Sequence, residues 1–122
     1  MLAKNKQGIM KTAKHLGISL DYSDARLIEY ILPSNKTGII RTVCVPHQNE
    51  HLYHSAYYQK LSEIILHYED VILFGSTDAK VDLLYFIIGD NRFAGVKIQI
   101  KYTLKMTENQ KLEFVKTYFS TC

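Results

Sequence analysis

Residues 71–82 constrain the fold of this chain most strongly. Four apolar residues end abruptly at Gly75, and a Ser-Thr-Asp sequence then opens a new periodic segment. This pattern is typical of a buried strand that turns directly into a helix. Open α/β sheets bind ligands at the carboxyl ends of their strands. The turn after the strand is therefore the first candidate for a functional site, although it contains no complete catalytic motif.

Three alternating apolar runs precede this segment and predict three strands, at residues 16–20, 25–32 and 39–45. Short polar turn clusters separate them, so we expect an antiparallel meander. Residues 46–54 are polar, which indicates a loop. Apolar residues then recur at helical spacing from Tyr57 to Tyr68, which predicts the first helix.

Residues 78–89 fit a strand or a helix by local pattern, because 83–88 are apolar throughout. Ser76 or Thr77 as N-cap and Gly89 as a C-terminal stop favour the helix. Residues 96–101 alternate as a half-exposed strand. Thr107 to Gln110 match a capping box, which predicts a last helix.

The predicted order is therefore β-β-β-α-β-α-β-α. A meander followed by right-handed crossovers gives an α/β domain with a five-stranded mixed sheet and helices on both faces, a ribonuclease H-like arrangement. We expect one domain over 15–122, preceded by a basic, flexible tail over 1–14. A helix that is apolar nearly all round needs cover on more than one face, which motivates a homodimer through 83–88.

The charge of the chain is concentrated at its start. The first fifteen residues contain four lysines, Lys4, Lys6, Lys11 and Lys14, and no acidic residue. The rest of the chain holds the other 11 of the 15 basic residues and all 12 acidic ones, so it is nearly neutral. No segment reaches the roughly 20 apolar residues of a membrane span or resembles a signal peptide. Cys44 and Cys122 have no metal or redox spacing. We expect a cytoplasmic protein without a cofactor.

The residues from 71 to 83, with the pattern Gly-Ser-x-Asp-x-Lys-x-x-Leu, resemble the middle domain of eukaryotic and archaeal class-one peptide release factors and of Pelota-type ribosome-rescue factors. The chain looks still closer to small stand-alone bacterial proteins of that type. Their hallmarks stand here as Asp21-Tyr22, residues 74–80 and the Lys-Met-Thr-Glu-Asn-Gln of 105–110. The resemblance covers about residues 16–120 in the order of elements, and only its last half is specific in residues.

One departure from the family decides the functional expectation. The release-factor domain carries a Gly-Gly-Gln tripeptide before its first helix, and its glutamine promotes hydrolysis of peptidyl-tRNA. Here Gln48 follows Pro46-His47, so the glycines that let the backbone approach an ester are missing. The resemblance then implies a binding module of translation, with the ribosome or RNA as partner, that is not an enzyme.

The turn 75–80 is a candidate anion site, because backbone N–H groups converge at a helix N-terminus beside Lys80. It is not a Walker A loop, since Val81 holds the magnesium-binding position and Asp78 repels phosphate. The alternative is a capping turn that only fixes geometry. Tyrosines near the first helix offer rings for stacking on bases or for a protein contact. The predicted contact residues are Gly75, Ser76, Thr77, Asp78, Lys80, Tyr53 and Tyr58.

Two metal sites remain as alternatives. Asp21, Glu63 and Asp78 stand where ribonuclease H-like nucleases hold metal-binding carboxylates, which would make the chain a metal-dependent nuclease or phosphoesterase. The structural alternatives are a turn at Asp21, a helical pair of Glu63 with His67 and a cap at Asp78.

The second candidate metal site consists of Glu50 and the histidines of the predicted loop, which are His47, His51 and His54. The spacing of these residues matches no strong metal-binding signature.

Overall fold

The computed structural model describes residues 15–31, 36–44 and 50–120. The predicted basic tail over 1–14 and His47 lie outside the described residues. Five strands form one sheet in the order β3-β2-β1-β4-β5. They are β1 (His15–Leu20), β2 (Asp24–Ile31), β3 (Lys36–Cys44), β4 (Asp70–Gly75) and β5 (Lys97–Tyr102).

The sheet is mixed, as the sequence predicts. β1, β2 and β3 pair antiparallel and form the expected meander. β4 pairs parallel with β1 on one side and with β5 on the other. The parallel strands β1 and β4 therefore meet at the centre of the sheet, with their carboxyl ends at the same edge.

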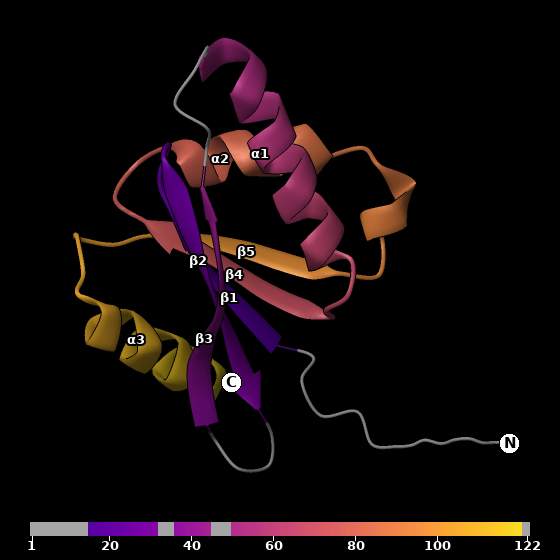
Figure 1. Cartoon of the computed structure of the whole chain (residues 1–122). Helices are drawn as coiled ribbons and strands as arrows, with labels where there is room; N and C mark the ends of the chain where they lie inside the picture. The colour runs from indigo at the N-terminus through magenta and orange to yellow at the C-terminus, as the bar shows by residue number, and fades with distance from the viewer. Residues whose placement is uncertain (1–14, 32–35, 45–49, 121–122) are drawn as a thin grey trace, which may run out of the picture.

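Helices cover both faces of the sheet (Figure 1). α1 (Glu50–Ile65) and α2 (Ala79–Ile87) lie on one face, and α3 (Glu108–Ser120) lies on the other. The core under α1 and α2 contains Leu16, Leu27, Leu61, Leu73 and Leu83, all fully buried. The predicted α/β class and the two-sided arrangement are confirmed.

α3 packs directly on the backbone of β1. A Cβ added at Gly17 would collide with the Val115 side chain of α3. The core on this face also holds Ile28, Ile72 and Phe74. Glycine in this strand thus lets helix and sheet approach closely.

The predicted helix ends are confirmed at two places. Thr107 and Gln110 form the reciprocal capping box, with Thr107 N donating to Gln110 Oε1 at 2.9 Å and Gln110 N donating to Thr107 Oγ1 at 3.2 Å. Gly89 follows α2 with a φ of 89°, a conformation that glycine adopts without strain. The segment 78–89 is therefore helical, as its flanking residues indicate.

The prediction of a loop over 46–54 is wrong in its second half, because α1 already begins at Glu50. No proline or glycine interrupts the chain between Glu50 and Ile65, and an acidic first residue is favourable at a helix N-terminus. Polarity alone therefore misplaced the start of the helix. A short 3-10 helix over Asn91–Phe93 follows α2 and was not predicted.

α2 is covered on one face only. Leu83 and Ile87 are buried, whereas Tyr85 and Ile88 are 69% and 65% exposed. The predicted homodimer through 83–88 stays a prediction. None of the described helices has the length and apolar character needed to span a bilayer.

Candidate functional site

The candidate site lies at the carboxyl ends of β1 and β4. Ser19 of β1 stands beside Phe74 of β4, and the chain turns away at the next residues of both strands. From here β1 leads to its neighbour β2, whereas β4 leads to β5 on the other side of the β1–β4 pair. Open α/β sheets bind ligands at such a divergence of neighbouring connections. Gly75 has a φ of 150°, and a Cβ there would lie 2.6 Å from the Leu20 carbonyl oxygen. Only glycine fits where the two turns touch.

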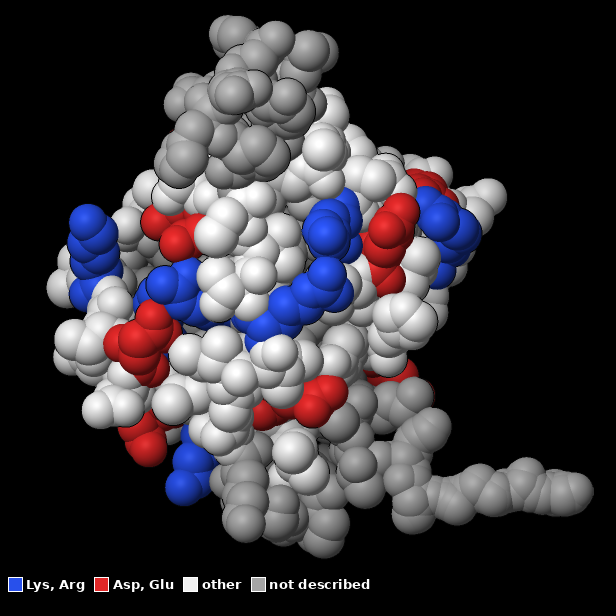
Figure 2. All heavy atoms as spheres, viewed as in Figure 1, with Lys and Arg blue, Asp and Glu red and all other residues white. Residues whose placement is uncertain are grey.

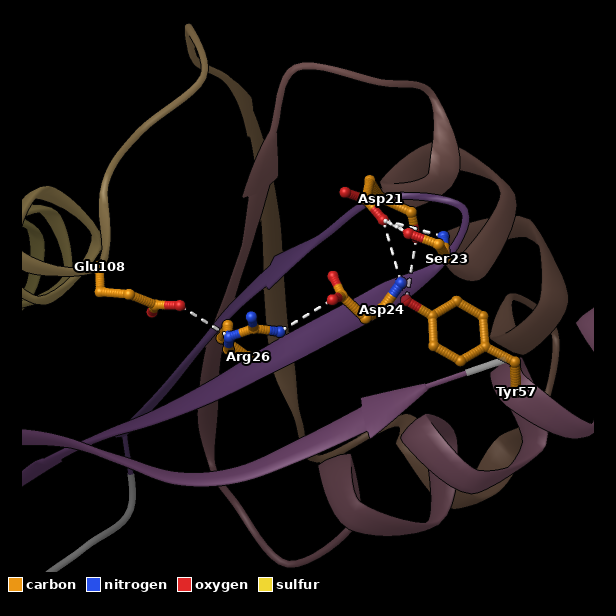
Figure 3. A network of polar contacts seen from close by, with 6 residues as sticks. All are labelled: Asp21, Ser23, Asp24, Arg26, Tyr57 and Glu108. Carbon is orange, nitrogen blue, oxygen red and sulfur yellow. Dashed lines mark hydrogen bonds and ion pairs between the residues drawn. The ribbon is translucent and has the colours of Figure 1, made fainter. Parts of the chain in front are cut away.

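Asp21 organises the turn after β1 (Figure 3). Its Oδ1 accepts hydrogen bonds from Ser23 N at 2.8 Å, Ser23 Oγ at 2.9 Å and Asp24 N at 3.0 Å. Burial alone would raise the pKa of Asp21, but these hydrogen bonds and nearby Lys111 outweigh it and hold the pKa below its usual value. Asp21 therefore acts as the carboxylate of a tight turn.

Two further contacts tie this turn to helices on opposite faces of the sheet (Figure 3). Tyr57 of α1 donates its hydroxyl proton to the Asp21 carbonyl oxygen at 2.9 Å. Arg26 of β2 bridges Asp24 at 3.0 Å and Glu108 of α3 at 2.9 Å. The turn is thereby fixed relative to both layers of helices.

A small polar crevice opens between the two turns. It has a volume of about 110 Å³, enough for a few water molecules or a small ion. Its lining brings two carboxylates together with two ammonium groups and two serine hydroxyls. The lining residues are Ser19, Leu20, Asp21, Asp24, Ser76, Lys105, Met106 and Lys111.

Lys80 points into the protein rather than toward the crevice. The residue is fully buried, and its Nζ lies 3.3 Å from the centroid of the Tyr102 ring and donates a hydrogen bond to the Thr77 carbonyl oxygen. Burial lowers the pKa of Lys80, and Asp78 partly offsets this effect. The ammonium group thus stabilises the turn through a cation–π contact and a backbone hydrogen bond.

Thr77 and Asp78 of the turn are also engaged in hydrogen bonds. The predicted N-cap, Ser76 or Thr77, is wrong, because Asp78 is the N-cap residue of α2. Thr77 precedes it, and Thr77 Oγ1 accepts a hydrogen bond from Ala79 N at 3.3 Å within the turn. Asp78 makes no side-chain cap and accepts a hydrogen bond from the Tyr102 hydroxyl at 2.5 Å. This hydrogen bond raises the pKa of Tyr102. The exposed end of the turn therefore presents carboxylates, Asp78 and Asp82, and its lysine is enclosed.

The predicted contact residues separate into different environments. Ser76 lines the crevice and Gly75 touches the Leu20 backbone, whereas Lys80 belongs to the interior. Tyr58 is only 7% exposed and packs against Tyr57 and Phe86, because it lies on the inner side of α1. Burial raises the pKa of Tyr58 to about 12, with Asp82 adding to the effect. Its ring therefore offers little surface for stacking, in contrast to our expectation.

The three carboxylates of the nuclease hypothesis do not form one site. Asp21 shapes its own turn, Asp78 contacts Tyr102, and Glu63 accepts a hydrogen bond from Gln59 in α1 at 2.9 Å. Within the described part of the chain, no group of three or more His, Cys, Asp or Glu side chains is arranged to hold a metal ion. The side chains of Tyr53, His51 and His54 are outside the description, as is the whole of His47.

Sequence reasoning missed several residues of the site. Tyr102 ends β5 and Lys105 follows this strand. The rule that pointed to the carboxyl end of β4 would therefore have found both residues at the carboxyl end of β5. Lys111 carried no such signal, because a lysine in the second turn of a helix is usually solvated. The bridge of Arg26 to Glu108 joins residues 82 positions apart and needs the fold to be known.

The fold is shared with several solved structures. They include the Pelota protein of Thermoplasma acidophilum (TM-score 0.60, 12% identity) and that of Archaeoglobus fulgidus (TM-score 0.58, 14% identity). A third is the archaeal translation termination factor aRF1 (TM-score 0.53, 14% identity). The matches cover 83%, 88% and 83% of this chain and 31%, 32% and 32% of the respective structures.

The chain thus spans about a third of the length of these proteins. At such identities the likeness establishes the fold, which agrees with the resemblance found in the sequence. No protein-family model matches the chain, and no curated protein sequence is significantly similar to it.

The interior position of Lys80 predicts a specific dependence of stability on pH. The pKa of Lys80 in the folded protein lies below its ordinary value of 10.5, so in the pH interval just below 10.5 the unfolded chain binds more protons than the folded one. Lys80 therefore contributes a rise with pH to the free energy of unfolding in this interval. In Lys80→Met this rise should be absent, which urea unfolding of both proteins at pH 7 and pH 10 would measure.

Lys101 provides the matched control, since it is exposed on neighbouring β5. Lys101→Met should follow the pH profile of the wild-type protein. Parallel profiles of the wild-type protein and Lys80→Met would contradict the buried position of Lys80.

Proposed function

We propose that this chain is a non-catalytic binding module of translation that contacts the ribosome or its RNA. The observation that carries the proposal is the fold shared with Pelota and aRF1, combined with the absence of the release-factor tripeptide from the sequence. The name of aRF1 describes it as a translation termination factor. Because fold alone does not imply function, the surface of this chain has to supply the contact.

The loss of the tripeptide supports binding without peptide release. In the sequence that precedes α1, Gln48 follows proline and histidine in place of the two glycines. A side chain at these positions blocks the close backbone approach that glycine permits. The carboxylates nearest the crevice are held in a turn and in an ion pair, which favours structural roles for them.

The charges around the crevice indicate where RNA would contact the protein. The turn 75–80 cannot offer Lys80 to a phosphate, since that ammonium is enclosed and Asp78 is exposed. Lys105 is exposed at the crevice, with Lys111 half-buried beside it. Lysine side chains bind phosphate as point charges, so we assign the phosphate contact to these two residues. Ser76, across the crevice, supplies a hydroxyl.

Cosedimentation with ribosomes at about 0.1 M salt tests the proposal, because exposed charge attraction is already screened at that ionic strength. We expect the wild-type protein to pellet with ribosomes. Lys105→Glu should pellet less, and its binding should depend less on salt, by about one unit of the logarithmic slope.

Lys116→Glu is the matched control, because Lys116 is exposed on α3 and does not line the crevice. It should pellet like the wild-type protein. Failure of the wild-type protein to pellet would refute the function, whereas equal pelleting of Lys105→Glu would refute only the assigned contact.

The uncovered face of α2 favours a second role, as a homodimer. Tyr85 and Phe86 of this short helix and Ile88 at its C-cap expose large apolar side chains to solvent. A second copy of the chain would bury them through a two-fold interface. Sedimentation velocity should show a dimer that Ile88→Asp converts to monomer. A wild-type protein that is monomeric at high micromolar concentration would exclude this role.

A further inference from the structure

A groove separate from the crevice lies between α1 and the edge strand β3. Its volume is about 450 Å³, four times that of the crevice. Residues from β2, β3, α1 and the segment after α1 line it. They are Leu27, Ile40, Arg41, Lys60, Glu63, Ile64, His67 and Tyr68. We call it the α1–β3 groove.

A β-bulge creates the β3 side of this groove. Leu27 of β2 pairs with Arg41, and the next residue, Ile28, pairs with Ile39, so Ile40 is an extra residue in β3. Successive strand residues normally point to opposite faces. The bulge breaks this alternation, and both Ile40 and Arg41 line the groove. Bulges that re-aim side chains in this way are frequent next to functional sites.

The rim of the α1–β3 groove is cationic. Arg41 and Lys60 are exposed, and neither forms an ion pair within the described part of the chain. Figure 2 shows basic side chains in a band across the middle of this face, with acidic side chains around it. The groove has one carboxylate among its lining residues, Glu63, which accepts a hydrogen bond from Gln59. An acidic partner therefore matches the groove in charge.

The floor of the groove is aliphatic. Leu27 is fully buried at its base, Ile64 is half-buried, and Ile40 remains 49% exposed. The Tyr68 hydroxyl is held by Glu29 at 2.6 Å, which fixes that ring at the margin. RNA-binding surfaces typically stack bases on aromatic rings, whereas branched aliphatic side chains form pockets for apolar side chains of peptides. The floor therefore favours a protein partner over a nucleic acid.

We propose that the α1–β3 groove docks an acidic segment of a partner protein that inserts one or two apolar side chains. Arg41 and Lys60 pair with the carboxylates of this segment, and Ile40 and Ile64 contact its apolar anchor. The groove is a second interface, on a different part of the molecule from the crevice, so it does not depend on RNA binding there.

Fluorescence anisotropy with labelled peptides tests the docking. The probe is a peptide of about ten residues in which a Leu-Phe pair is flanked by aspartates. One comparison peptide replaces Leu-Phe by Ser-Ser, and another replaces the aspartates by lysines. We expect the probe to bind, and each comparison peptide to bind about tenfold more weakly, which corresponds to about 1.4 kcal/mol.

Variants place the peptide on the groove. Arg41→Glu and Ile40→Ser change exposed side chains, so both should fold and should lose about tenfold in affinity for the probe. Lys116→Glu, with the same charge change on α3, should bind like the wild-type protein. Amide chemical shifts should move at Ile40, Arg41 and Ile64 on addition of the peptide.

Three results would overturn the docking proposal. They are the absence of peptide binding, undiminished binding by Arg41→Glu, and a single-stranded RNA of about ten nucleotides displacing the probe from the groove. Each is independent of ribosome cosedimentation, whose Lys105→Glu variant leaves this groove unchanged. The two proposals can therefore fail separately.

Discussion

The parallel pairing of β1 with β4 is the constraint on which the rest of the structure depends. It places two chain turns at one edge of the sheet, where Gly75 approaches the Leu20 carbonyl oxygen too closely for any side chain. A parallel neighbour also requires a long crossover, which α1 supplies from β3 to β4. The helix that makes this crossover fixes the Asp21 turn through the Tyr57 hydroxyl. The crevice is thus a consequence of strand pairing.

The enclosed ammonium of Lys80 changes what the turn after β4 can do. A lysine at a helix N-terminus suggests an anion-binding site, but the Lys80 ammonium group is held by the Tyr102 ring and the Thr77 carbonyl oxygen. The contact joins the turn to the end of β5 and leaves Asp78 exposed beside it. Phosphate is repelled from that side. The cations suited to binding stand elsewhere, at Lys105 by the crevice and at Arg41 by the α1–β3 groove.

The sequence predicts the fold well where local signals and global pairing agree. The capping box at Thr107, the stop at Gly89 and the meander of three alternating runs are all local patterns, and each appears in the structure. The start of α1 was misplaced because polar residues are compatible with both a loop and an exposed helix face. No local signal distinguishes these two states.

The site was harder to predict than the fold, because it depends on which way side chains turn. Lys80 and Tyr58 were expected at a contact surface and are buried, since neighbouring elements cover them. The Ile40 bulge is set by the pairing of β3 with β2 and leaves no mark in the sequence of either strand. Arg26 reaches Glu108 only after α3 has packed on the sheet. Such tertiary features decide which polar residues remain available to a partner.

The environment of Lys80 gives the most direct test of the claim that the turn 75–80 has a structural role and does not bind an anion. Proton and carbon NMR of protein labelled at lysine would report it, with Lys80→Met identifying the resonance. The Cε protons of Lys80 should be shifted upfield by the ring current of Tyr102 and should return to the position of the other lysines in Tyr102→Leu. A Lys80 resonance at the position of solvent-exposed lysines in the wild-type protein would contradict the account.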